Sequence, residues 1–292
     1  MVHAFHAFAA IRAHHRTDHV TLLTTQPYRA LLETSPWFDA VRVDERAPWW
    51  NLPALLRTST ALRGYQFTYD LQTSRRSNRY FHLAGRPPWS GIARGASHPH
   101  TNPARDAMHT IERQREQLQA AGITIFPPPD RTWLTSQGHT HGLRTPYALL
   151  MPGGAGLGPV KQWPSNRYAA AACHLLALGI TPAIIGGPLE VPLAHTIRDA
   201  CPEAVDLTGR TTIPDLAALG AGAALVLGND TGPVHLAASA GAPTIVLFSA
   251  AGVPAQAAPR GPDGEWPTVL QAINLHELPA AAVTAAIDGV LR

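Results

Sequence analysis

Residues 228–236 read GNDTGPVHL; they follow a short apolar run, 224–227, and their last three residues begin a longer, mostly apolar run, 234–240. The first run has the length of a buried strand, and Gly-Pro ahead of the second is typical of a helix N-terminus. The polar residues are therefore expected at the carboxyl edge of a sheet. Asp230 or Thr231 could cap the helix, but open amides at a helix N-terminus beside a hydroxyl also favour an anion such as a diphosphate.

The second half of the chain repeats this alternation of short apolar runs and helical segments. We predict strands at 147–151, 183–185, 205–207, 224–227 and 244–248, and helices over 166–178, 192–200, 214–219 and 234–240. Strands that alternate with helices every ~20–25 residues indicate right-handed βαβ units and a parallel sheet.

The first half follows the same pattern less regularly. We predict an opening helix from residue 2, strands at 20–24, 40–43 and 67–71, and helices over 28–33, 52–63 and 105–121. Segment 126–144 is rich in Pro, Thr and Gly and lacks periodicity, so we place a linker there. The expected domains are 1–135 and 145–292, both doubly wound. Such a domain normally opens with a strand, so either the strand order is unusual or a first strand is missing.

Length and composition agree with two domains and argue against several classes of protein. The chain has 292 residues, of which 45% are apolar and 15% charged, too apolar for intrinsic disorder. No apolar run approaches the ~18 residues of a membrane span.

The two cysteines make no disulfide framework and the 15 histidines show no metal-ligand spacing, so we expect a cytoplasmic protein without a metal site. The net charge of +3 comes from dispersed arginines and gives little support for nucleic acid binding.

A glycine-rich loop, GGAGLG at 153–158, follows the first strand of the second half. Pro159, Lys161 and Trp163 separate it from the next helix, so it does not meet the dinucleotide fingerprint. It still suits a phosphate, because bare amides, a cation and a helix N-terminus converge there. Lys161 is the sole lysine among 23 basic residues, which favours a specific role over chance. A surface loop without function is the alternative.

Further polar residues follow other predicted strands. Glu190 ends the motif GGPLE after strand 183–185, where a carboxylate could bind a ribose or lie on a surface helix. His235 could contact a ligand or serve only the helix that contains it. Arg75, Arg76 and Arg79 follow strand 67–71 and could hold an acidic acceptor or form a solvated helix face. Three loops at three strand ends of the second half would line one pocket.

Together these motifs resemble glycosyltransferase family 9, the ADP-heptose:lipopolysaccharide heptosyltransferases. The resemblance rests on KQWP at 161–164, GGPLE at 186–190 and GNDTGPVHL at 228–236, and more weakly on FTYDLQTSRRS at 67–77. It implies an α/β fold of GT-B type, in which two doubly wound Rossmann-like domains face a cleft. It also implies an inverting, metal-independent glycosyl transfer without a cofactor.

The resemblance assigns roles to residues of this sequence. The first domain would hold the acceptor and the second the nucleotide-diphospho-sugar, in which ADP-heptose is the expected donor. Lys161 would stabilise the charge that builds on the diphosphate leaving group, Asp230 would orient the donor and Glu190 would bind the ribose. The full donor set would be Gly153, Gly154, Lys161, Glu190, Asp230, Thr231, Gly232 and His235. The acceptor would be the acidic, lipid-linked core of lipopolysaccharide, near Arg75, Arg76 and Arg79, with the enzyme peripheral on the inner membrane.

The start of the chain departs from the family pattern. Members typically open with a strand and a Gly-Asp pair whose Asp is the catalytic base, and this chain resembles the segment directly after that pair. We therefore expect the first strand to be missing and leave the general base unassigned, with Asp70 or His6 as substitutes. Two other readings stay open: a non-catalytic or N-terminally truncated relative that binds the sugar nucleotide without transfer, and a sugar-nucleotide epimerase.

Overall fold

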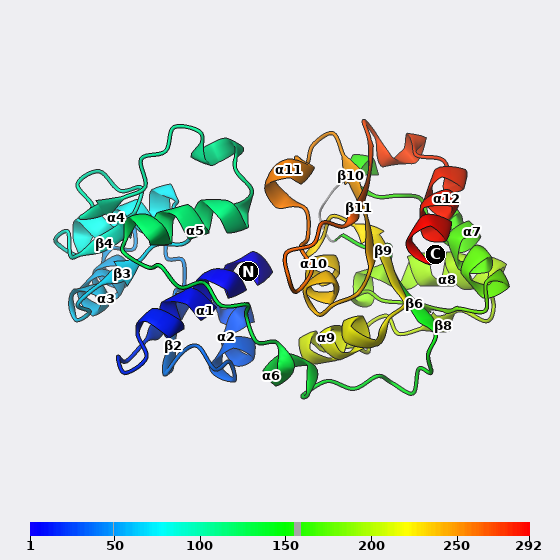
Figure 1. The fold of residues 1–292 in the computed structure, drawn as a ribbon, viewed down its shortest axis with the longest axis horizontal. Coiled ribbons are helices and arrows are strands. Elements are labelled where there is room, and N and C mark those ends of the chain that lie inside the picture. The colour runs from blue at the N-terminus through cyan, green and yellow to red at the C-terminus, as the bar shows by residue number, and fades with distance from the viewer. Residues whose placement is uncertain (49, 155–158) are drawn as a thin grey trace. The chain divides into compact units, whose positions relative to one another are not determined.

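The computed structural model describes residues 1–48, 50–154 and 159–292, and divides the chain into two compact units, essentially 3–130 and 131–292 (Figure 1). Each unit consists of parallel strands with helices packed against them. Among the described residues, no helix combines the length and the apolar character needed to cross a bilayer.

The second unit is built on one parallel sheet of six strands. These are β6 (Tyr147–Met151), β7 (Thr181–Ile184), β8 (Val205–Asp206), β9 (Leu225–Asn229), β10 (Thr244–Ser249) and β11 (Thr268–Ala272). Their spatial order is β8-β7-β6-β9-β10-β11, so the chain winds one way from β6 and then the other way from β9. Every residue of β6, β9 and β10 is buried, as expected for central strands covered by helices on both faces.

The second unit has five long helices and several short ones. They are α7 (Ser165–Ala177), α8 (Val191–Ala200), α9 (Ile213–Gly222), α10 (Gly232–Ser239) and α12 (Ala280–Val290), with short α6 (Thr132–Thr135), α11 (Pro254–Ala257) and 3-10 turns Pro159–Lys161, Pro188–Glu190 and Leu275–Glu277. The sequence did not predict β11 or α12. β11 is an only partly buried edge strand, and α12 buries just Val283 and Ile287 of its alanine-rich face, so neither gives a strong periodic signal.

The predicted linker, 126–144, carries structure of its own. It contains α6, whose Leu134 is buried and which packs against α9. Further along, the amide of His139 donates to Asp215 Oδ1 at 2.7 Å, and Asp215 also accepts from the amide and hydroxyl of Thr212. Burial alone would raise the pKa of Asp215, but these hydrogen bonds hold it well below its ordinary value. The stretch 131–141 is thereby fastened to the second unit.

The first unit holds two small parallel sheets instead of one. Its strands are β1 (Thr21–Thr24), β2 (Ala40–Val43), β3 (Thr68–Tyr69), β4 (Trp89–Gly91) and β5 (His98–Pro99), and its helices are α1 (Phe5–His14), α2 (Gln26–Glu33), α3 (Leu52–Arg63), α4 (Arg75–Leu83) and α5 (Thr110–Ala120), with 3-10 turns Val2–Ala4 and Arg105–Ala107. Among the described residues of this unit, β1 pairs only with β2, while β3, β4 and β5 form the other sheet. α1 and α5 share one core cluster, and α3 and α4 share another.

Two predictions for the first unit were incomplete. The helix predicted over 105–121 is interrupted, because His109 has an extended backbone and its Nδ1 accepts the amide of Ile111 to start α5. α4, β4 and β5 were not predicted at all. α4 is largely polar and begins with a capping box between Ser74 and Ser77, and of its nine residues only Ser77, Tyr80 and Phe81 are buried.

Candidate functional site

The side chain of Asn229 joins three segments at the point where the second sheet reverses its winding. Asn229 is the last residue of β9 and is fully buried. Its Nδ2 donates to the carbonyl of Pro152 at 2.9 Å and to that of Gly153 at 3.4 Å, just after β6. Its Oδ1 accepts from the amide of Trp163 at 3.3 Å and the hydroxyl of Tyr168 at 3.2 Å. Ligands of doubly wound folds bind outside the carboxyl ends of the strands at this switch point.

The start of α10 lies directly beyond Asn229. Thr231 is the N-cap residue with an extended backbone, yet its side chain makes no capping hydrogen bond. Asp230 does not serve as cap either, since its Oδ1 lies 2.9 Å from His235 Nε2. A Cβ added at Gly232 would meet no atom within 4 Å, so this turn faces open space. The capping alternative therefore does not account for Asp230 and Thr231. Among the described residues no side chain caps the first amides of α10, which suits them to bind an anion.

Lys161 is positioned by the residues that follow it. Trp163 is almost fully buried and is held at both ends, by its amide on Asn229 and by its Nε1, which donates to the carbonyl of Leu278 at 2.9 Å. Lys161 itself is half-buried at the end of its 3-10 turn, and within the described residues no carboxylate pairs with it. Of the glycine loop, Gly153 and Gly154 are described, whereas positions 155–158 lie outside the described residues.

Glu190 lies between the loops that follow β6 and β7. It is buried, and its Oε2 accepts the amide of Gly187 at 2.7 Å. A Cβ at Gly153 would lie 2.3 Å from its Cγ, and one at Gly186 would lie 2.6 Å from its Cβ. A larger residue at either position would force the Glu190 side chain to shift. The structure thus gives Glu190 a role within the protein, which the sequence did not reveal, and leaves its predicted ribose contact untested.

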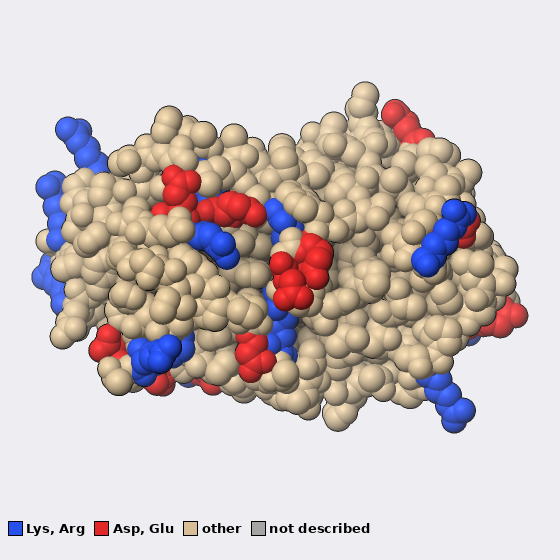
Figure 2. All heavy atoms as spheres, in the orientation of Figure 1, with Lys and Arg blue, Asp and Glu red and all other residues tan. Residues whose placement is uncertain are grey.

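The predicted residues of the first unit do not form one set. Arg75 and Arg79 are exposed on α4, while Arg76 donates to the carbonyl of Ala47 at 2.9 Å and so supports the loop after β2. Figure 2 shows basic side chains gathered along the edge of this unit that α3 and α4 form. The exposure of Arg75 and Arg79 agrees with a solvated helix face and equally leaves both side chains open to an acidic acceptor, so both alternatives stay open.

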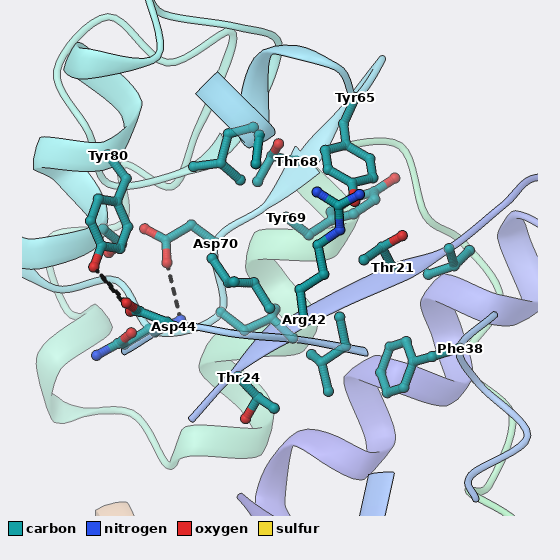
Figure 3. A pocket seen from close by; sticks show the side chains of 18 of the residues that line it. Thr21, Thr24, Phe38, Arg42, Asp44, Tyr65, Thr68, Tyr69, Asp70 and Tyr80 are labelled. Carbon is teal, nitrogen blue, oxygen red and sulfur yellow. Dashed lines mark hydrogen bonds between the residues drawn. The ribbon is translucent and has the colours of Figure 1, made fainter. Parts of the chain in front are cut away.

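Two buried carboxylates differ in how their oxygens are used. Both oxygens of Asp44 accept the hydroxyl of Tyr80, at 2.9 and 3.0 Å (Figure 3). Asp70, directly after β3, accepts the amides of Gln72 and Thr73 on Oδ1, but its buried Oδ2 has no hydrogen-bond partner among the described residues. Burial raises the pKa of Asp70 above its ordinary value. Both side chains line a cavity of about 1160 Å³ within the first unit.

We predict that Asn229→Asp destabilises the protein by about 1–3 kcal/mol, because the new oxygen would face the carbonyls of Pro152 and Gly153 where an amide now donates. Chemical denaturation measures the change. Asn274→Asp is the matched control, since Asn274 uses its Oδ1 to accept the amide of His276 and an aspartate can do the same. Equal stability of the two variants would contradict the bridging role of Asn229.

Comparison with known proteins agrees with the resemblance drawn from the motifs. The model of glycosyltransferase family 9 (heptosyltransferase) matches residues 56–259. Lipooligosaccharide heptosyltransferase 2 of Haemophilus influenzae is 36% identical over 100 residues, which are 32% of this chain and 29% of that protein. The matched segment thus spans less than a third of that relative.

Solved structures match over nearly the whole chain. The Escherichia coli ADP-heptose lps heptosyltransferase II is 19% identical, with a TM-score of 0.75 over 100% of this chain and 95% of that one. The E. coli heptosyltransferase WaaC with ADP is 19% identical, with a TM-score of 0.74 over 99% and 95%. At this identity the likeness establishes the fold, which is the expected α/β fold of GT-B type. Because the family model covers most of the sequence, from 56 to 259, this chain belongs to glycosyltransferase family 9.

Proposed function

We propose that this protein transfers a heptose-type sugar from a nucleotide-diphospho-sugar, with ADP-heptose as donor, to the core of lipopolysaccharide. The reaction inverts the anomeric carbon and uses no metal. The observation that carries the proposal is the uncapped N-terminus of α10 at the switch point of the second sheet, in a chain of the heptosyltransferase family. Two solved relatives named for ADP-heptose and for bound ADP support the choice of donor.

The second unit supplies the groups that would bind and activate the donor. The amides at Thr231 and Gly232 and the ammonium of Lys161 would hold the diphosphate. As the bond from sugar to phosphate breaks, negative charge grows on the leaving diphosphate, so these groups bind the transition state more strongly than the ground state. Asp230, fixed by its contact with His235, would orient the sugar.

The loops around Glu190 would complete the donor site. Glu190 packs closely against Gly153 just after β6, and the oxygen that does not accept the amide of Gly187 would bind the ribose. Asn229 joins this loop to the segment that carries Lys161. The nucleotide and the diphosphate would therefore be held by loops and a lysine-bearing segment whose positions are fixed relative to one another.

In the first unit we assign the general base to Asp70. An inverting transfer needs a base to take the proton of the acceptor hydroxyl, a contribution of about 10²–10⁴-fold in rate. Among the described residues Asp70 Oδ2 is buried without a hydrogen-bond partner and burial raises the pKa of Asp70, whereas both oxygens of Asp44 are engaged by Tyr80. The acidic, lipid-linked acceptor would lie near Arg75 and Arg79, which places the enzyme on the cytoplasmic face of the inner membrane as a peripheral protein.

The donor assignment is tested by thermal shifts with ADP, UDP and GDP at equal concentration. We expect the largest stabilisation with ADP, because stabilisation grows with the ratio of ligand concentration to dissociation constant. Transfer is then measured from ADP-heptose to a lipid-linked core acceptor. Binding of ADP without acceptor-dependent transfer would favour a non-catalytic relative, and a changed sugar nucleotide in the absence of acceptor would favour an epimerase.

We predict that Lys161→Ala weakens ADP binding by about 1–3 kcal/mol, the scale of a charge-assisted hydrogen bond, and leaves the melting temperature nearly unchanged. Isothermal calorimetry gives the affinity. Arg198→Ala removes one exposed positive charge from α8 in the same unit and should bind ADP like the wild type. Equal affinities for wild type and Lys161→Ala would refute the assignment.

We predict that Asp70→Asn lowers the rate of transfer by about 10²–10⁴-fold while ADP affinity stays the same. The variant should also be more stable than the wild type at about pH 7, and this gain should vanish toward about pH 3. The reason is that burial raises the native pKa of Asp70, so the unfolded chain ionises first as pH rises through the ordinary pKa, and stability is lost.

Urea denaturation across this pH range and initial-rate kinetics provide the two measurements. Glu45→Gln is the control, because Glu45 is an exposed carboxylate that lines the same cavity. We expect it to change neither property. Full activity of Asp70→Asn would assign the base to another residue.

A further inference from the structure

The chain has two cysteines, and the fold brings both to one place in the second unit. Cys173 is an exposed residue of α7, and Cys201 is the buried residue that directly follows α8. β7 and α8 separate the two positions in the sequence. They become neighbours because α7 and α8 pack against each other (Figure 1).

Small side chains allow α7 and α8 to approach each other closely. Ala169 of α7 and Ala194 of α8 belong to one buried cluster, together with Ile197 and Cys201. Cys201 follows Ile197 by one helical turn, and its amide donates to the carbonyl of Ile197 at 2.9 Å. Cys173 follows Ala169 by one turn on the other helix. Cys201 therefore lies inside the contact between the helices, and Cys173 lies at its margin.

The two cysteines contact each other directly. The thiol of Cys173 donates to the carbonyl of Ala200, the residue before Cys201, at 3.4 Å. A side-chain hydrogen bond also joins the two thiols. Cys201 is held in the core, whereas the Cys173 side chain is exposed and can change its rotamer without disturbing packed neighbours. A disulfide needs Cβ atoms ~3.5–4.5 Å apart, a separation that two thiols already in contact can reach by such a rotation.

The surroundings of the two thiols give them different reactivity. Burial raises the pKa of Cys201 to about 11, and the neighbouring Cys173 thiol adds to this effect. At neutral pH the Cys201 thiol is therefore protonated almost completely, and it is buried from solvent. Cys173 is open to solvent, so a reagent meets this thiol first. Cys173 is thus the attacking thiol of the pair, and Cys201 is the thiol that can resolve the product.

We propose that Cys173 and Cys201 form a redox modification site, a dithiol that a small-molecule disulfide such as oxidised glutathione closes into an intramolecular disulfide. First, the Cys173 thiolate attacks the glutathione disulfide, forms a mixed disulfide and releases one glutathione thiolate. The Cys201 sulfur then attacks the sulfur of Cys173, forms the protein disulfide and releases the second glutathione thiolate. The two cysteines lose two electrons and two protons, and one glutathione disulfide becomes two glutathione thiols.

The position of the pair indicates what its closure does. α7 and α8 both begin beside loops of the candidate donor site, after Lys161 and after Glu190. Cys173 lies ~12 Å along α7 from its first residue, and Cys201 lies beyond the opposite end of α8. The disulfide therefore fastens the two helices together away from those loops. This inference concerns the second unit alone and does not rest on the proposed function.

The experiment uses the full chain, with oxidised glutathione as the probe. The reduced protein is incubated with this reagent, the remaining thiols are blocked, and the mass of the intact protein is measured without reduction. Trypsin, which cleaves after Arg167, Arg198 and Arg210, places the two cysteines in separate peptides, 168–198 and 199–210. A closed pair is therefore identified by the joining of these two peptides.

Two variants separate the two steps. Cys173→Ser removes the attacking thiol, so we expect this protein to gain no glutathione and to keep its buried thiol. Cys201→Ala removes the resolving thiol, so we expect Cys173 to accumulate a mixed disulfide with one glutathione. Because Cys173 is exposed, its replacement by serine leaves the core intact. The comparison of Cys173→Ser with the wild type therefore gives an answer even if Cys201→Ala folds poorly.

We expect the wild type to lose two hydrogen atoms, to gain no glutathione and to yield the joined peptides. Its melting temperature should rise by about 5–10 °C on closure, because the disulfide restricts the unfolded chain, and Cys173→Ser should show no such rise. A wild type that stays reduced, stops at the mixed disulfide or joins two chains through Cys173 would overturn the proposal. An unchanged melting temperature of the joined form would overturn the fastening of the two helices.

Discussion

The four hydrogen bonds of the Asn229 side chain hold the candidate donor site together. A buried amide has two donors and two acceptor positions, and here each end contacts two partners. Because the partners belong to the loop after β6, the segment after Lys161 and the start of α7, one residue fixes three segments relative to the N-terminus of α10. Leaving such a buried group unpaired is costly, so the loops cannot separate easily. The segment that carries Lys161 and the start of α10 are thereby held in fixed positions relative to each other through Asn229, without a direct contact between the Lys161 ammonium and the amides of α10.

The second sheet was largely predictable from the sequence, and the reason lies in its burial. Strands covered on both faces are continuous apolar runs, so β6, β9 and β10 were placed within one or two residues. β2 and α3 in the first unit were also placed correctly. α4 was missed because its helix is specified by the capping box at Ser74 and by two buried aromatic residues, with little apolar periodicity. β3 was predicted at 67–71 but comprises only Thr68–Tyr69, and β4 and β5 were missed because two or three residues are too few for a periodic pattern.

The site was predictable at the level of its motifs but not of its contacts. The three loops after β6, β7 and β9 do come together, as expected, since Gly153 contacts both Glu190 and Asn229. The sequence could not show that Asn229 binds backbone carbonyls, because every residue has a backbone carbonyl and the residue type therefore does not identify the partner. It also could not show that the Glu190 side chain packs closely against Gly153 and Gly186. In each case a residue that looked like part of a phosphate or ribose site also serves the fold.

The two units differ in how their central strands are paired, and this difference affects where each unit can bind a ligand. In the second unit the switch point lies between two paired strands, β6 and β9, so the loops above it rest on a continuous ladder. Among the described residues of the first unit, no strand pairs the remaining edges of β1 and β3, and Asp70 borders the cavity that both strands line. A buried carboxylate oxygen without a described partner is costly, and such an arrangement persists only where surrounding structure or function maintains it. Because the amides of Gln72 and Thr73 hold Oδ1, the turn directly after β3 fixes the position of this carboxylate.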